Sequence, residues 1–218
     1  MRAAIVMGLV LTAAASARAQ VEESPRPGWR LAVGAVGGAV AFDEHLADYR
    51  WDTRPAAQAG MQATLYRGRF GAGARVWRAH TTQASGIPGE TRVPRVNLTA
   101  LEMLAHVRVA AVRGIELWGS AHGGLLHLGY DPDELSFDTG GGAGAVTVRY
   151  APISEWDYGL GAELRRELGG QLALSLQAEW SAFALDTAHR SGAEIVESRE
   201  RFHSWSLRMQ VSWLLNLG

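Results

Sequence analysis

The 218-residue sequence contains no cysteine and no lysine, so all 21 of its basic residues are arginine. The lack of cysteine excludes disulfide bonds and a cysteine-linked lipid anchor. The formal net charge of −1 gives no support for nucleic-acid binding, which needs a basic surface. Beyond residue 19 there is no apolar run of the roughly 18 residues that a membrane-spanning helix requires. A disulfide scaffold and a helical membrane protein are therefore excluded.

The first residues have the features of an export signal. An arginine at position 2 precedes an apolar segment, which ends in Ala17-Arg18-Ala19, a small-x-small pattern before Gln20. We expect residues 1–19 to be a signal peptide that is removed. Residues 20–28, which are polar and contain proline, are expected to form a periplasmic lead-in. The alternative is a buried N-terminal helix.

The stretch WSLRMQVSW, residues 205–213, alternates strictly between apolar and polar side chains. A period of two is typical of a β-strand whose two faces meet different surroundings. Similar alternation occurs in seven further runs, at residues 29–41, 57–66, 70–77, 100–109, 115–125, 156–165 and 172–182. The sequence therefore predicts eight strands.

The connections between these strands alternate in length. Short links are expected at 67–69, 110–114 and 166–170, and long ones at about 43–55, 82–94, 131–154 and 186–199. A transmembrane barrel has short turns on the periplasmic side and long loops outside. We therefore predict an all-β fold, an eight-stranded antiparallel up-and-down transmembrane β-barrel over residues 29–218, with both ends on the periplasmic side. Within the third loop, the apolar run at 145–150 could add a hairpin above the membrane.

The two faces of the predicted strands differ in charge. One face is apolar, and the other has ten charged or histidine residues, which we expect to form an ion-pair network in the lumen: Arg75, Glu102, His106, Arg108, Glu116, Asp157, Glu163, Arg165, Glu179 and Arg208. In a soluble lipocalin-like barrel, the apolar face would instead line a ligand cavity. The loop alternation and a small, glycine-rich inner face favour lipid outside.

Aromatic residues on the apolar face support the same orientation. Tryptophan and tyrosine prefer the two interfaces of a membrane, where they form girdles. The expected girdle residues are Trp29, Phe70 and Trp213 near the periplasmic ends, with Trp156, Tyr158, Trp180 and Trp205 near the outer ends.

From about Trp29 to Gly218, the strand count, the loop alternation and the closing segment HSWSLRMQVSWLLNLG resemble the small eight-stranded outer-membrane barrels of Gram-negative bacteria, of the OmpA-transmembrane-domain, OmpX and OmpW type. The resemblance implies a place in the outer membrane and assembly by the barrel-insertion machinery. Members of that family usually end on an aromatic residue, whereas this chain ends in Leu217-Gly218.

The resemblance and the charge pattern imply a non-enzymatic envelope protein with a filled lumen, acting as a structural, surface-binding or complex-subunit protein. We expect no cofactor and no metal, and interpret His106 and His122 as hydrogen-bonded core residues. On the outer face, Arg78 and His80 in one strand and Arg201 and His203 in another are expected at the outer boundary. Arginine there suits the phosphates of lipopolysaccharide, with unspecific snorkelling as the alternative.

An acyl hydrolase or acyltransferase acting on lipid A is the alternative function, because some barrels that resemble this one modify that lipid. Such chemistry needs a serine beside a histidine at the outer rim, oriented by an acid. The rim histidines His80, His127 and His203 have no serine two residues away on the same face, which counts against an enzyme.

Overall fold

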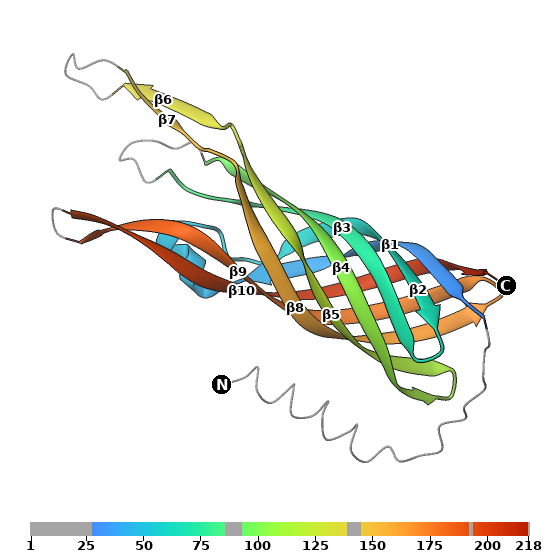
Figure 1. The fold of residues 1–218 in the computed structure, drawn as a ribbon. Coiled ribbons are helices and arrows are strands. Elements are labelled where there is room, and N and C mark those ends of the chain that lie inside the picture. Colours follow the sequence, from blue (N-terminus) through green and yellow to red (C-terminus); the bar gives the residue numbers. More distant parts are fainter. Residues whose placement is uncertain (1–27, 86–92, 139–144, 192–193, 218) are drawn as a thin grey trace.

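The computed structural model describes residues 28–85, 93–138, 145–191 and 194–217, and the expected signal peptide lies outside them. Eight strands form a closed antiparallel barrel in the order β1-β10-β9-β8-β5-β4-β3-β2 (Figure 1). Their bounds are β1 (Arg30–Phe42), β2 (Ala56–Arg67), β3 (Phe70–Thr82), β4 (Arg95–Val112), β5 (Ile115–Asp131), β8 (Ile153–Gly169), β9 (Leu172–Ser191) and β10 (Glu194–Asn216). The predicted fold, an eight-stranded up-and-down transmembrane barrel, is confirmed.

Tight turns close one end of the barrel, where Figure 1 also shows the C-terminus. β2 and β3 are joined by residues 68–69, β4 and β5 by residues 113–114, and β8 and β9 by residues 170–171. In the second of these turns Arg113 has a φ of 51° and Gly114 a φ of 79°. Two positive φ values match the primed hairpin turns whose twist suits antiparallel strands. Each of the three turns has two residues, fewer than the three to five residues that the sequence predicts for the short links.

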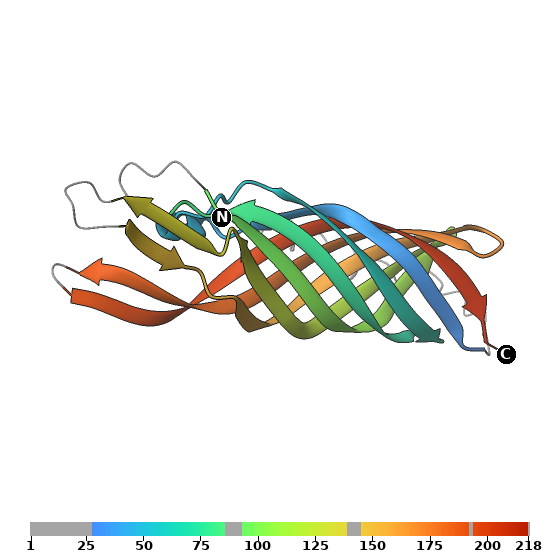
Figure 2. The same cartoon turned by 90° about the horizontal axis from the view of Figure 1, so that it is seen from above.

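The opposite end is built from longer segments, which project away from the barrel in both Figure 1 and Figure 2. A 3-10 helix, η1 (Glu44–Tyr49), follows β1, and β6 (Glu134–Asp138) pairs with β7 (Ala145–Arg149) as a separate hairpin. The hairpin expected around residues 145–150 is thus present. The loop expected over 186–199 is wrong, because β9 and β10 pair up to Ser191 and Glu194. Beyond the membrane no lipid requires one apolar face, so the alternation that would predict these strand ends is lost.

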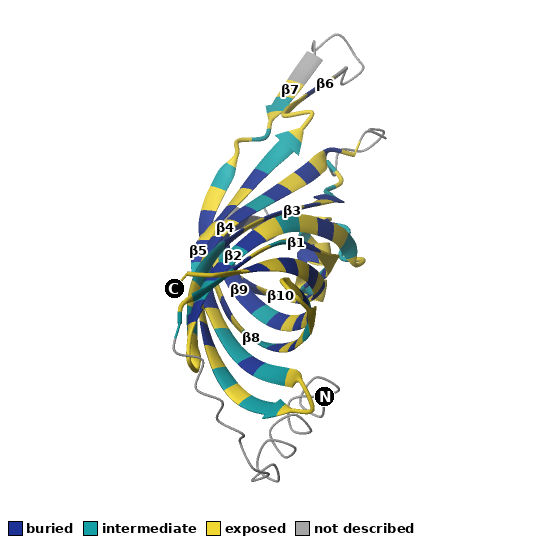
Figure 3. Cartoon of the chain, turned by 90° about the vertical axis from the view of Figure 1, so that its right-hand side faces the viewer, coloured by how far each residue is buried: buried dark blue, intermediate teal, exposed yellow. Residues whose placement is uncertain are grey.

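Buried and exposed residues largely alternate along the barrel strands (Figure 3), and large apolar side chains are among the exposed ones. Leu101, Met103 and Trp156 expose 60%, 68% and 69% of their surface. A continuous band of such side chains would promote association in water, whereas acyl chains cover it favourably. Within the lipid-facing band of the described residues, the soluble lipocalin-like arrangement, with the apolar set lining a cavity, is not observed. No helix among the described residues has the length and apolar character to span a bilayer.

The polarity of both faces inverts toward the end of the barrel that carries the longer segments, which we call the outer end. On β4 the outward side chains change from Met103 and Leu101 to Thr99 and Asn97. The inward side chains change from Glu102 to Ala100 and Leu98, which are buried. Above this level the barrel therefore has the ordinary arrangement of a water-exposed β-protein, with an apolar interior. The inversion marks the outer edge of the lipid-facing band.

Two arginine substitutions on one face of β4 test this boundary. Ala105→Arg places a charge in the middle of the outward apolar run, and we expect a loss of about 2–4 kcal/mol in the free energy of unfolding in lipid vesicles. Asn97→Arg, on the same face above the boundary, should cost at most about 1 kcal/mol. Denaturant titration measures both. Equal losses would show that the band does not face lipid.

Candidate functional site

A buried ion-pair layer crosses the middle of the lumen. Both carboxylate oxygens of Glu179 accept hydrogen bonds from Arg75, at 2.8 and 2.7 Å, and Glu179 also accepts one from Arg208. Arg75 donates through Nε to Glu102 at 2.8 Å, and Arg208 donates to Gln58 at 3.0 Å. All five side chains are buried. Glu179 is therefore the centre of the layer, because it balances two guanidinium groups at once.

Four more of the predicted network residues are buried on the same inner face. Asp157, Glu163, Arg165 and His106 are buried, and His106 Nδ1 lies 3.5 Å from a carboxylate oxygen of Glu163. Arg165 stacks over the ring of Tyr66 at 4.5 Å.

Arg108 and Glu116 are only partly buried, and they pair with each other at 3.0 Å instead of joining the central group. Their Cα partners are Trp118 and Ala111, close to the tight β4–β5 turn. The ten predicted residues thus share the inner face, but they form several small groups and not one network.

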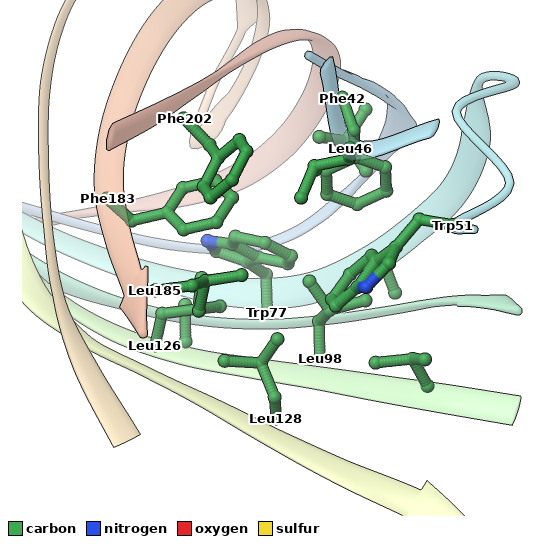
Figure 4. Close-up of a cluster of buried hydrophobic side chains, with 14 residues drawn as sticks. Phe42, Leu46, Trp51, Trp77, Leu98, Leu126, Leu128, Phe183, Leu185 and Phe202 are labelled. Carbon is green, nitrogen blue, oxygen red and sulfur yellow. The ribbon is translucent and has the colours of Figure 1, made fainter. Parts of the chain in front are cut away.

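An apolar layer fills the outer half of the lumen (Figure 4). Leu46 of η1 is completely inaccessible, and Trp51 packs edge-on against Phe42 at 6.5 Å. The layer comprises Val40, Phe42, Leu46, Trp51, Trp77, Ala79, Val96, Leu98, Ala100, Leu126, Leu128, Phe183, Leu185 and Phe202. Sequence reasoning missed this layer. The sequence feature that indicates the layer is a run of apolar residues on the inner face at the outer ends of the strands, such as Leu126 and Leu128.

Above the apolar layer is a cavity of about 450 Å³ that opens outward. Its volume is within the range of small-molecule sites. The cavity is lined by the η1 segment, by the ends of β5 and β8, and by β9 and β10: Leu46, Asp48, Tyr49, Arg50, Trp51, Gln83, Ala84, Ser85, Tyr130, Tyr150, Ile153, Leu185, Asp186, Thr187 and Phe202. We call this cavity the mouth pocket.

Aromatic rings and hydrogen-bonding groups share the walls of the mouth pocket. Tyr130 and Tyr150 stack with ring centroids 5.1 Å apart. Tyr49 packs edge-on against Phe202, and its hydroxyl donates to Glu200 at 2.7 Å. Burial raises the pKa of the Tyr130 phenol, and the neighbouring Tyr150 adds to the increase. The hydroxyl of Tyr130 therefore stays protonated at neutral pH and can donate a hydrogen bond.

Hydrogen bonds hold the segment that covers the pocket. Trp51 forms a β-bridge with Gln83, whose side-chain amide donates to the carbonyl of Tyr49 at 3.1 Å. Thr81 donates through its hydroxyl to the carbonyl of Asp52 at 2.6 Å. These bonds join the first outer segment to the end of β3. One backbone bridge and two side-chain hydrogen bonds to backbone carbonyls thus hold this wall of the mouth pocket.

The four residues predicted to contact lipopolysaccharide are exposed on the outer face. Arg78 and His80 are on β3, whereas Arg201 and His203 are on β10. The strands β2 and β1 lie between β3 and β10 in the barrel. The structure therefore keeps the two pairs separate. His203 stacks against Trp180 at 5.1 Å, and on β10 the outward residues change from apolar to basic just above Trp205.

The predicted girdle residues point outward. Trp29, Phe70, Trp156, Tyr158, Trp205 and Trp213 are exposed, while Trp180 is partly covered by His203. At the turn end, Trp29 lies under the guanidinium of Arg67 at 5.0 Å.

Sequence reasoning also missed a serine and a histidine that meet at the outer rim. His127 Nδ1 lies 2.9 Å from Ser154 Oγ, on the exposed face of the paired strands β5 and β8. Searching for a serine within one strand could not find this cross-strand pair. Among the described residues, no carboxylate forms an ion pair with His127. The pair therefore lacks the acid that would orient the histidine for acyl transfer.

No model of a known protein family matches the chain, and neither does any curated protein sequence. Among solved structures, neisserial surface protein A matches at 9% identity with a TM-score of 0.50, over 85% of this chain and 96% of that one. OprG from Pseudomonas aeruginosa matches at 7% identity with a TM-score of 0.44, over 87% of this chain and 97% of that one. Ail of Yersinia pestis matches at 12% identity with a TM-score of 0.39, over 85% of this chain and 99% of that one.

The similarity to neisserial surface protein A is one of fold alone, because so few residues are identical. Together with the closed ring of strands, it defines the class of the protein. The fold is that of the small eight-stranded outer-membrane β-barrels.

Removing the charge of Glu179 tests its central place in the ion-pair layer. Glu179→Gln leaves Arg75 and Arg208 buried without their shared carboxylate, so we expect the free energy of unfolding to fall by about 3–5 kcal/mol. Glu134→Gln is the control, since Glu134 pairs with Arg149 at 3.2 Å on the exposed hairpin and should matter by less than about 1 kcal/mol. Denaturant unfolding of the refolded variants gives both values, and similar values would contradict a central role for Glu179.

Proposed function

We propose that this protein is an outer-membrane surface protein that binds a small molecule in its mouth pocket and does not conduct solutes. The observation that carries the proposal is the order of layers along the lumen. A buried ion-pair layer and an apolar layer fill the interior, and the mouth pocket lies directly above them, open to the outside. A filled interior suits a scaffold, and loops on a rigid scaffold commonly bind ligands.

The walls of the pocket suggest the chemistry of its ligand. Tyr130 and Tyr150 offer flat rings, while Asp48, Arg50 and Asp186 offer charged hydrogen-bonding groups of both signs. A neutral molecule with a flat apolar face and several hydroxyl groups would use both kinds of wall. Glycosides with an aromatic substituent have this combination.

The pocket is tested with p-nitrophenyl β-D-glucoside, which is neutral and water-soluble, and a sample of detergent without protein corrects for uptake of the probe into micelles. We expect saturation-transfer NMR signals from this probe with the refolded protein. Tyr130→Ala should weaken its binding about three- to tenfold, the effect of losing one aromatic contact. Tyr158→Ala, which removes an exposed tyrosine of the lipid-facing surface, is the control and should bind normally.

Two results would contradict the proposed function. One is a probe signal that is absent or unchanged by Tyr130→Ala. The other is steady ionic conductance of the protein in a planar bilayer, because a lumen with filled layers should not conduct.

We further propose that Arg78 and Arg201 bind anionic groups of lipopolysaccharide. Both are exposed beside the outer edge of the lipid-facing band, and neither has an ion-pair partner among the described residues. Guanidinium groups bind phosphate through paired hydrogen bonds. The cross-strand pair of His127 and Ser154 lies at the same rim, but without an acid it gives little support to lipid A hydrolysis.

The double variant Arg78→Ala and Arg201→Ala should retain less lipopolysaccharide when the protein is purified from outer membranes. Arg113→Ala is the matched control, since Arg113 lies in the β4–β5 turn at the other end of the barrel. Retained lipid A is measured by mass spectrometry. Unchanged retention in the double variant would exclude a specific contact at these positions.

A further inference from the structure

Three metal-ligating side chains converge below the apolar layer, in the middle of the lumen. Glu102 of β4, His122 of β5 and Asp157 of β8 are buried, and one ligand atom from each lies within 4.8 Å of the other two. We propose that they bind one divalent transition-metal ion of the Zn²⁺ type. β4, β5 and β8 are consecutive in the barrel, so the ion would join three neighbouring strands.

The strand register creates the space between these ligands. Glu102 and Asp157 are both directly opposite Gly124 of β5, and this glycine places no side chain between the two carboxylates. His122 precedes Gly124 by two residues and is opposite Gly159. A Cβ atom at position 159 would lie 2.5 Å from Cε1 and 2.8 Å from Nε2 of His122. Glycine at this position therefore leaves room both for the imidazole ring and for the carbonyl oxygen of Trp180, which would lie 2.1 Å from the same Cβ atom.

Two of the ligands have atoms without a hydrogen-bond partner. Nδ1 of His122 and Oδ1 of Asp157 are both unsatisfied, and their side chains are only 0% and 3% exposed. A buried polar atom left unpaired costs about 1–3 kcal/mol. The nearest charged atom to His122 Nε2 is Oδ2 of Asp157 at 3.8 Å, too far for a direct hydrogen bond. A cation between Nε2 and Oδ2 would bridge this gap, while Nδ1 faces Oε2 of Glu179 at 3.9 Å.

Neighbouring side chains orient the ligands as they do around known metal sites. Ser181 Oγ lies 3.0 Å from Nε2 of His122, the ring nitrogen on the side of Asp157, so an ion bound through Nε2 would take the place of this hydrogen bond. Glu102 is held by the indole of Trp77, which donates to Oε1, and by Arg75, which donates to Oε2. Arg75 donates to Oε2 through both Nε and Nη2, so Oε1 is the oxygen of Glu102 that keeps a second lone pair for a metal.

The charge of the lumen also favours a cation. The buried central part holds four carboxylates, Glu102, Asp157, Glu163 and Glu179, against three guanidinium groups, Arg75, Arg165 and Arg208. One imidazole nitrogen with two carboxylate oxygens is a donor set of Zn²⁺ and its neighbours, and three protein ligands leave a position for water. The rival occupant is a single proton on His122 beside Asp157.

The experiment refolds untagged protein in detergent with a small excess of Co²⁺ or Zn²⁺, removes free metal by gel filtration and measures the metal content. We expect about one ion per chain for the wild type, and visible Co²⁺ absorption that Zn²⁺ displaces. His122→Gln and Asp157→Asn should each lower the content at least tenfold. His106→Gln is the matched control, because His106 also lies beside a buried carboxylate, that of Glu163 at 3.5 Å, but outside the proposed ligand set.

Far-UV circular dichroism establishes that each variant is folded. If a variant does not fold, the Co²⁺ absorption spectrum of the wild type tests whether a histidine nitrogen and carboxylate oxygens bind the ion. A wild type that retains no metal would overturn the proposal in favour of the proton. A retained ion that survives His122→Gln would place it elsewhere on the protein and would equally overturn the proposal.

Discussion

A bilayer offers no hydrogen-bond partners to a polypeptide backbone, and this constraint determines most of the structure. Only a closed ring of strands leaves no unpaired edge in lipid, so β1 must return to β10. Closing only eight strands makes the interior narrow, and the two-residue period then sends every second side chain into it. Polar groups enclosed there must satisfy one another. The ion-pair layer around Glu179 is the result of closure as much as of any function.

The part of the fold that lies in lipid could be predicted from the sequence, because lipid demands a strict alternation. Residues 205–213 alternate fully, and β10 places them as expected. Outside the membrane that demand is absent. The sequence near Ser191 and Glu194 therefore does not alternate between apolar and polar residues. It predicts a loop where the ends of β9 and β10 pair. The 3-10 helix η1 depends on contacts with strands distant in sequence, which a local pattern does not contain.

The site was predictable in its residue types and not in its contacts. The two-residue alternation alone assigns Arg75 and Glu179 to the inner face. They are 104 positions apart in the chain, however, and only the register of the five strands from β3 to β9 brings them together. The same holds for His127 and Ser154, which meet across β5 and β8. The apolar layer was missed for another reason. Its inner-face residues resemble the lipid-facing set, and only the inverted polarity of the outer face distinguishes them.

The order of the layers links the pocket to the charges below it. Leu46 and Trp51 seal the lumen between the mouth pocket and the ion-pair layer. Excluding water lowers the effective dielectric constant around Arg75 and Glu179, which strengthens their attraction and makes any unpaired charge more costly. A ligand in the mouth pocket would rest on the apolar side of this seal. A ligand at the proposed site could thus exchange with the outside without crossing the apolar layer, so binding there need not disturb the buried ion pairs that hold the barrel.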